Sequence, residues 1–432
     1  MKKPELLMPA GNLEILKTAF NFGADAVYLG GDMYGLRAKA HNFSNEEIAE
    51  GVEFAHKLGK KVYITVNITA HNYDIEGIKK YLKELAVIAP DGFIISDPGV
   101  FMLAAELAPN VERHISTQAN NVNYLDYNFW YKLGATRVVS ARELSLAEIK
   151  EIRANIPEDM EIESFIHGAM CISYSGRCLL SNYLTGRDAN LGECTHPCRW
   201  RYHLVEETRP GVYMPVEENE RGTYIFNSRD LCMIDHIPEI VDAGINSLKV
   251  EGRMKTALYV ATVARAYRNA IDSYFESPEE YAKNAALFAE EITKCTNRQF
   301  TTGFYFGKPS SDAQIYDSND YNKDYIYLGT VLKTRYFIGD NEIPAASISD
   351  DMMKNSDIRS ECELIQKNKF CKGDLIERLA PGSLEKQERR VLMIKNEAGE
   401  EMESCPHASQ RIFVTVQGYI AQNDLLRVGP ND

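Results

Sequence analysis

The sequence predicts an α/β protein: a (β/α)8, TIM-like barrel with a cysteine-rich insertion, followed by a small C-terminal all-β domain. Three observations lead to this prediction. The first 250 residues hold eight short apolar runs, amphipathic segments separate most of these runs, and short β-type runs replace them beyond residue 325. An open, doubly wound sheet is the alternative for the first part, and the count of eight runs favours the barrel.

The eight apolar runs are interpreted as the barrel strands, because each is short and ends in a polar residue or a glycine turn. They cover residues 5–11, 26–31, 61–67, 92–97, 111–118, 137–142, 161–167 and 247–253. Helical patterns lie between most of them, for example over 12–23 and 44–59. Ser44 followed by Glu47 is typical of a capping box, and Gly23 is typical of a helix end.

The domain boundaries follow from changes in composition. We expect the barrel over residues 1–300, interrupted by the cysteine-rich insertion at 168–246, which is far longer than a usual strand-to-helix connection. A linker rich in Gly, Ser, Asn and Asp is expected at 301–325. The remaining segment, 326–432, is predicted to form a small β-barrel accessory domain, and the run at 345–349 is taken as one of its strands.

Composition and charge limit the function classes. The chain is 44% hydrophobic and 25% charged, which is ordinary for a globular protein. No apolar run approaches the ~20 residues that a membrane span needs, and the first residues contain no apolar stretch of a signal peptide. A cytoplasmic location is therefore the expectation. The formal net charge of -14 argues against a general nucleic-acid binder but is compatible with a local basic patch.

Five of the nine cysteines cluster between residues 171 and 232, although buried structural cysteines would scatter with the core. They are Cys171, Cys178, Cys194, Cys198 and Cys232. Thiolates bind zinc or iron–sulfur clusters. Only the pair Cys194 and Cys198 has the spacing of a zinc knuckle, so the wide separations favour an iron–sulfur cluster. Cys232 is predicted to begin a helix, and a merely buried helical cysteine is the alternative for it.

Polar residues at the predicted strand ends should face one common site, because the carboxyl ends of parallel strands meet at one face of the fold. They are Asn67, Asp97, Gln118, Arg142, Glu163, His167, Glu251 and Arg253. Glu163 and His167 lie on the same predicted strand with even spacing, so both are expected to point inward. His167 and Glu163 are the candidate catalytic residues, with His167 as general acid or base, and a hydrogen-bonded histidine at a strand end is the alternative for His167.

Residues 163–178, ESFIHGAMCISYSGRC, resemble the signature of the peptidase U32 family, also called the collagenase-like family. The segments 186–202, 227–255 and 297–305 resemble further blocks of this family, so the resemblance spans nearly the whole chain. Within the family, the chain most resembles the tRNA hydroxylation protein P branch. This resemblance implies oxygen-independent formation of 5-hydroxyuridine at wobble position 34 of tRNA, with prephenate required as co-substrate.

The resemblance also implies a cofactor and partners. A [4Fe–4S] cluster would be held by four cysteines, which match Cys171, Cys178, Cys194 and Cys232 in one branch, whereas another branch brings in Cys198 as the fourth ligand. Expected partners are tRNA, a small dicarboxylate ligand and a second U32-family subunit, without a membrane. Substrate-binding residues are expected at the strand ends, namely Asn67, Gln118, Arg142, Lys249, Glu251 and Arg253.

The basic residues and the RNA-binding segment of this site also have simpler explanations. Two of Arg142, Lys249 and Arg253 would clamp a dicarboxylate such as prephenate, and ion pairs with Glu163 or Glu251 would explain them equally well. For RNA, the segment 199–203 interleaves cations with aromatics. Its candidate RNA-binding residues are Arg199, Trp200 and Arg201, and five residues make a weak signal.

Proteolysis is the alternative activity, as the family name suggests. The sequence has no HExxH motif, and Ser175 lacks the G-x-S-x-G elbow. Cys171 and His167 are four residues apart and could form a cysteine-protease pair, but the other clustered cysteines would stay unexplained. A non-enzymatic scaffold is the third class, and the polar strand ends argue against it.

Overall fold

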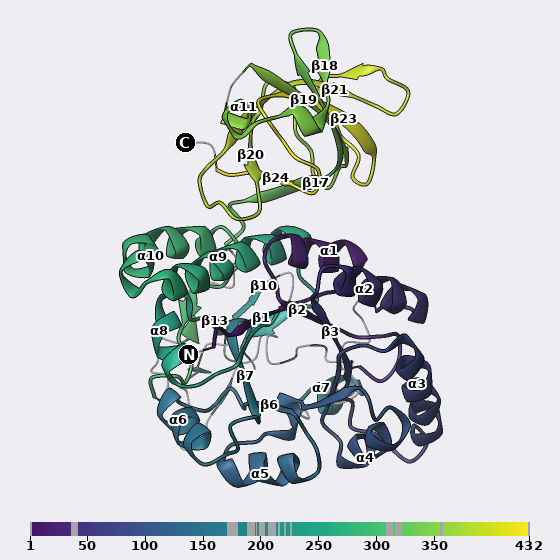
Figure 1. The fold of residues 1–432 in the computed structure, drawn as a ribbon, viewed down its shortest axis with the longest axis vertical. Helices are drawn as coiled ribbons and strands as arrows, with labels where there is room; N and C mark the ends of the chain where they lie inside the picture. Colours follow the sequence, from purple (N-terminus) through teal and green to yellow (C-terminus); the bar gives the residue numbers. More distant parts are fainter. Residues whose placement is uncertain are drawn as a thin grey trace.

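The computed structural model describes residues 2–35, 42–170, 180–187, 195, 197, 204–205, 213–214, 217–219, 222–224, 227–307, 314–315, 322–354 and 357–430. Figure 1 shows two parts, a barrel surrounded by helices and a smaller β domain beside helices α1, α9 and α10. The candidate RNA-binding residues and four of the five clustered cysteines lie outside the described residues: Cys171, Cys178, Cys194, Cys198, Arg199, Trp200 and Arg201.

The first part is a closed barrel of eight parallel strands. The strands are β1 (Glu5–Pro9), β2 (Ala26–Leu29), β3 (Lys61–Val66), β4 (Gly92–Ile95), β5 (Glu112–Ile115), β6 (Arg137–Val139), β7 (Glu161–Gly168) and β14 (Ser247–Val250). Each pairs with the next in parallel, and β14 pairs with both β7 and β1, which closes the barrel. The predicted (β/α)8 fold is therefore confirmed, and each predicted run contains one strand.

Helices cover the outside of the barrel (Figure 1). They are α1 (Leu13–Asn21), α2 (Asn45–Lys57), α3 (Ile75–Ile88), α4 (Pro98–Leu107), α5 (Tyr124–Lys132), α6 (Leu146–Ala154), α8 (Ile237–Asp242), α9 (Ala257–Glu276) and α10 (Pro278–Thr293). The predicted capping box of Ser44 and Glu47 opens α2, and Gly23 adopts a φ of 107° after α1. Within the described part of the chain, no helix is long and apolar enough to cross a membrane.

The described parts of the insertion and of the segment after α10 hold one short helix and several short strands, one of which pairs with β7. They are α7 (Leu180–Thr185), β8 (Leu204–Val205), β9 (Tyr213–Met214), β10 (Glu217–Asn219), β11 (Gly222–Tyr224), β12 (Asn227–Ser228), β13 (Asp230–Cys232), β15 (Phe300–Thr301) and β16 (Gln314–Ile315). β13 pairs antiparallel with β7 and parallel with β15. Cys232 therefore ends a strand, and the prediction that it begins a helix is wrong, because pairing with the end of β7 extends this segment.

The C-terminal part is an antiparallel sheet that closes on itself. Its elements are β17 (Ile326–Ile338), β18 (Asn341–Ile343), η6 (Ala345–Ser347), α11 (Asp350–Lys354), β19 (Ile358–Ile365), β20 (Leu375–Leu379), β21 (Glu388–Lys395), β22 (Glu401–Met402), β23 (Arg411–Gln417) and β24 (Leu425–Val428). The long β17 pairs with both β19 and β24, which closes the sheet. The expected strand at 345–349 is a 3-10 turn instead, because Ser347 Oγ bonds back to Pro344 O at 2.7 Å.

A buried charge cluster joins the two parts. Glu291 of α10 accepts from Arg265 of α9 at 2.5 Å and from Arg427 of β24 at 3.1 Å. Arg427 also pairs with Glu377 of β20 at 2.7 Å. Burial opposes the ionisation of Glu291, but Arg265 and Arg427 outweigh it and hold its pKa below the usual range. Two guanidinium groups from different domains thus depend on one carboxylate.

We predict that Glu291→Gln lowers the free energy of unfolding by about 3–5 kcal/mol, because breaking a buried ion pair leaves uncompensated charge. Chemical denaturation of the purified chain measures this. Glu290→Gln is the control, because Glu290 is the neighbouring residue, is 64% exposed and pairs at 2.8 Å with Lys294, which also lies 3.4 Å from Glu291, so this variant leaves both arginine pairs of Glu291 in place. A loss below about 1 kcal/mol in Glu291→Gln would show that the cluster contributes no more than a surface pair.

Candidate active site

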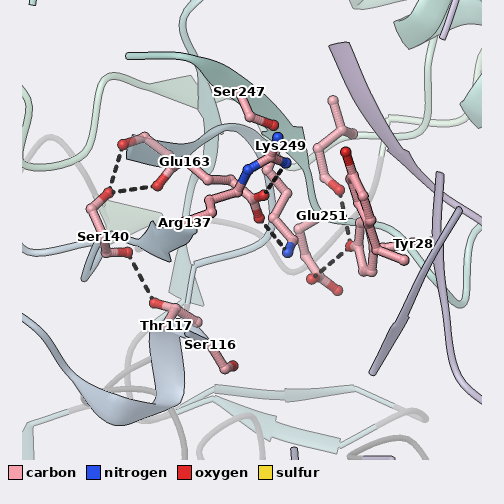
Figure 2. A network of polar contacts seen from close by, with 12 residues as sticks. Tyr28, Ser116, Thr117, Arg137, Ser140, Glu163, Ser247, Lys249 and Glu251 are labelled. Carbon is pink, nitrogen blue, oxygen red and sulfur yellow. Dashed lines mark hydrogen bonds and ion pairs between the residues drawn. The ribbon is translucent and has the colours of Figure 1, made fainter. Parts of the chain in front are cut away.

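Glu163 of β7 lies in the barrel interior between two cations (Figure 2). Its carboxylate oxygens lie 2.6 Å from Lys249 Nζ of β14 and 3.1 Å from Arg137 Nη1 of β6. Burial opposes ionisation of Glu163, but the charges of Lys249 and Arg137 outweigh it and hold its pKa below the usual range. Glu163 is therefore a buried carboxylate that fixes the Lys249 ammonium group.

Arg137 connects this pair to the base of the barrel. It lies 2.7 Å from Glu5 Oε1 of β1 and 2.5 Å from Glu161 Oε2, and its guanidinium carbon is 5.0 Å from the ring centre of Tyr63. Tyr63 Oη and Ser247 Oγ donate to Glu5 at 2.7 and 2.8 Å. Burial disfavours the charged form of Glu5, yet Arg137 outweighs this effect and lowers its pKa to about 2. Arg137, Glu5, Tyr63 and Ser247 thus form one connected polar network at the base of the barrel.

Towards the carboxyl ends of the strands, cations lie against aromatic rings. Lys249 Nζ is 4.4 Å from the ring centre of Tyr28 and 5.4 Å from that of Phe165. Arg142 stacks on Phe165 with its guanidinium carbon 4.0 Å from the ring centre. The Glu251 carboxylate contacts two of these residues: it lies 3.8 Å from Arg142 Nη2 and 3.4 Å from Tyr28 Oη. The structure therefore brings Arg142, Lys249 and Glu251 together, and cations on aromatic faces suit a planar anionic ligand.

Amide and hydroxyl groups form the rim over β3, β5 and β6. Asn67 Nδ2 donates to Ser116 Oγ at 3.4 Å, and Ser116 caps the short helix η1 (Thr117–Ala119), which contains the half-buried Gln118. Thr117 Oγ1 donates to Ser140 O at 3.1 Å, as Figure 2 shows. Asn67 and Gln118 thus lie on one hydrogen-bonded rim.

Two predicted strand-end residues have contacts elsewhere. Arg253 donates to Asn42 Oδ1 at 2.9 Å and to Thr65 Oγ1 at 3.4 Å, which places it on the β2–β3 side. Its guanidinium packs on Gly30, where a Cβ atom would collide with it. Asp97 accepts from Val100 N at 2.9 Å and so caps α4. Arg142 and Lys249 both contact the ring of Phe165 on β7, whereas Arg253 contacts residues near β2 and β3.

The expectation that His167 points inward with Glu163 is wrong. Consecutive residues Lys249 and Val250 of β14 pair with Phe165 and His167 of β7, so Ile166 is an extra residue in β7. Such a bulge reverses the alternation of side chains along a strand. Phe165 therefore faces the interior with Glu163, whereas His167 faces helix α9 outside the sheet.

His167 is enclosed by an aromatic pocket on this outer side. Its ring lies 5.6 Å from the rings of both Tyr267 and Phe300 and 6.0 Å from that of Tyr259. Its Nδ1 is 3.5 Å from Tyr267 Oη, and its Nε2 is 3.9 Å from Cys295 Sγ. Burial lowers the pKa of His167 to about 4, so the imidazole is neutral at neutral pH.

Cys232 lies directly opposite His167 in the β7–β13 pair. Its thiol is half-buried and lies 3.7 Å from Tyr267 Oη, and burial raises its pKa to about 12. Its neighbour Leu231 and the last described residue before Cys171, Met170, pack on Gly303, where a Cβ atom would lie 3.3 and 3.5 Å from them. The chain thus brings Cys232 close to the segment that leads to Cys171.

This arrangement fits a thiolate-bound metal group. A half-buried thiol becomes a thiolate when a metal cation compensates its charge. Within the described ranges, no group of three or more His, Cys, Asp or Glu side chains is arranged to hold a metal ion. Cys232 is the single proposed ligand in these ranges, so any cluster would take its other ligands from the undescribed part of the insertion.

Sequence reasoning missed several residues of this region. Arg137 and Tyr28 lie within predicted strands, and their inward positions could have been found from the alternation of side chains. His167 is contacted by three side chains that lie about 100 or more residues later in the sequence, namely Tyr267, Cys295 and Phe300. The sequence holds no signal for these long-range contacts.

Comparisons with known proteins agree with the fold. The model for peptidase family U32 matches residues 11–315, and that for the peptidase family U32 C-terminal domain matches 352–427. tRNA hydroxylation protein P1 of Bacillus subtilis strain 168 is 41% identical over 428 residues, which cover 99% of this chain and 95% of that protein. tRNA hydroxylation protein P of Escherichia coli K12 is 38% identical, covering 88% and 87%.

A third relative carries a different name. An uncharacterized protease of Methanocaldococcus jannaschii is 44% identical over 305 residues, which cover 70% of this chain and 73% of that protein. The two family models together span most of the chain, and two of these relatives match 99% and 88% of it. The chain belongs to peptidase family U32.

Proposed function

We propose that this protein is a tRNA-modifying hydroxylase that forms 5-hydroxyuridine at wobble position 34 without O2. The observation that carries this proposal is the match over 99% of the chain to a protein named for tRNA hydroxylation. The site agrees with it, because the cations and aromatic rings at the barrel mouth suit an anionic ligand. A tRNA substrate also accords with a cytoplasmic location.

The proposed co-substrate is a dicarboxylate, prephenate. Arg142 and Lys249 present positive charge around Phe165, and Glu163 and Glu251 orient these two cations from behind. Arg142 can pair a carboxylate in bidentate fashion, which Lys249 cannot. In the proposed site, a bound carboxylate competes with Glu251 for Arg142, because their present contact of 3.8 Å is long.

A [4Fe–4S] cluster is the proposed cofactor. Replacing the C5–H bond of uracil by C5–OH adds one oxygen atom and removes two electrons, for which prephenate is the proposed co-reactant, and a cluster would supply the electron-carrying centre that side chains lack. Cys171, Cys178, Cys194 and Cys232 are the proposed ligands. The position of Cys232 beside the end of β7 supports its inclusion.

The tRNA contacts remain proposals from the sequence. The segment 199–203 supplies cations and aromatics for phosphates and bases, and the closed β domain offers a second surface. A second subunit of the same family is a further proposed partner.

The surroundings of His167 argue against a cysteine peptidase. Both ring nitrogens face buried partners, Tyr267 and Cys295, and the ring is 1% exposed. Burial raises the pKa of Cys295, so this thiol stays protonated and is a poor nucleophile. His167 also lies across β7 from Glu163, so the two do not act on one ligand. We therefore assign Glu163 to the barrel site and His167 to the Cys232 side.

We expect tRNA from a host strain lacking its own U32 hydroxylases to regain 5-hydroxyuridine when this chain is expressed. Nucleoside mass spectrometry of digested tRNA measures the product. The same strain carrying an empty vector is the control. Unchanged tRNA despite soluble, iron-loaded protein would contradict the proposed substrate, and appearance of peptide cleavage with the purified chain would favour the protease alternative.

Cys232→Ala is expected to lose the cluster iron, whereas Cys198→Ala is expected to keep it, because Cys232 lies beside the segment that leads to Cys171. Iron and sulfide analysis after anaerobic purification measures this. The reverse pattern would identify Cys198 as the fourth ligand. Zinc in place of iron in the wild type, even after anaerobic reconstitution, would overturn the redox proposal.

Arg142→Gln is expected to weaken prephenate binding by about 10-fold or more, because a hydrogen bond to a charged group is worth about 1.5–3 kcal/mol. Calorimetric titration of the purified chain with prephenate measures this. Arg113→Gln is the matched control, because Arg113 lies near the start of β5 and donates to Gly134 O at 3.0 Å. Equal affinities in both variants would remove Arg142 from the ligand site.

A further inference from the structure

The phenol oxygen of Tyr267 lies where strands β7 and β13 meet, on the outer side of the barrel. It donates to Ile166 O at 2.9 Å and accepts from Met233 N at 3.0 Å. It also lies 3.7 Å from Cys232 Sγ and 3.5 Å from His167 Nδ1. One hydroxyl therefore contacts both strands and the two facing side chains.

The geometry of the strand pair explains this convergence. His167 and Cys232 are direct partners in an antiparallel pair, so their side chains lie on the same face of the sheet. The bulge at Ile166 turns that face towards α9, where Tyr267 is completely buried. A phenol has one donor and can accept in addition, and both capacities are used on the backbone of the two strands.

Met233 N also donates directly to Ile166 O at 3.0 Å, so the Tyr267 hydroxyl adds to a backbone bond between the strands and extends it to the thiol of the proposed metal ligand, Cys232. The hydroxyl ties Ile166, next to His167, to Met233, next to Cys232. Groups that touch a metal-binding side chain from behind fix its orientation, and their loss typically weakens metal binding about 10–100-fold.

We propose that Tyr267 is a positioning residue for metal ligation by Cys232. This rests on the proposed function, because it presumes that Cys232 holds an iron–sulfur cluster. Tyr267 touches no ligand at the barrel mouth in this proposal and acts only through Cys232 and the β7–β13 pair.

Tyr267→Phe removes the hydroxyl and keeps the ring against His167. The matched control is Tyr305→Phe, because Tyr305 Oη is also buried and donates at 2.5 Å to Phe165 O, one residue earlier on the same strand. We expect anaerobic Tyr267→Phe to lose iron to a ferrous chelator about 10-fold faster than wild type. Tyr305→Phe should lose iron at nearly the wild-type rate. Thermal unfolding measures how much stability each variant loses with its hydroxyl group.

Two results would overturn this assignment while leaving the cluster in place: equal iron loss in Tyr267→Phe and wild type, or equally fast loss in both variants. A wild-type chain without iron would overturn the proposed cofactor and this inference together. If Tyr267→Phe does not fold, fluorotyrosine at position 267 keeps the shape and makes the hydroxyl more acidic. The proposal then requires a shift in reduction potential that fluorotyrosine at position 305 does not produce.

Discussion

The arrangement of both proposed sites depends on the bulge in β7. Because Ile166 is extra, Glu163 and Phe165 face the interior while His167 faces α9. Without the bulge, an unbroken alternation would place His167 in the barrel beside Lys249. One strand therefore serves two separate environments: a charged interior on one side, and an aromatic and thiol pocket on the other. Beyond the bulge, the end of β7 pairs with β13, which carries Cys232.

The charged interior is stable only because its charges are matched. Burying an isolated carboxylate or ammonium group costs far more than a domain can offset, so each must have a partner. Glu163 lies between Arg137 below and Lys249 above, and Glu5 shares Arg137 from the opposite side. The position of the Lys249 ammonium at the mouth is therefore linked, through two ion pairs, to the base of the barrel. This linkage holds the cation in place before any ligand arrives.

The sequence predicted the fold well because strand ends and helix caps are local signals. Eight apolar runs gave eight barrel strands, and the Ser44 capping box appears where it was expected. Of Arg142, Lys249 and Arg253, which were predicted to end neighbouring strands, Arg142 and Lys249 do meet at Phe165, whereas Arg253 contacts Asn42 and Thr65. The bulge has no local signal, so the direction of His167 was wrong. Cys232 was misassigned because its strand forms by pairing with β7 and β15, which no local pattern encodes.

The two environments meet in the three residues after His167. Arg142 stacks on Phe165 inside the mouth, yet its Nη1 donates to Ala169 O at 2.8 Å. Glu251 N donates to His167 O at 2.9 Å, while the Glu251 carboxylate approaches Arg142. Arg142 and Glu251, two of the proposed ligand-binding residues, are thus bonded to the backbone of Ala169 and His167 at the end of β7.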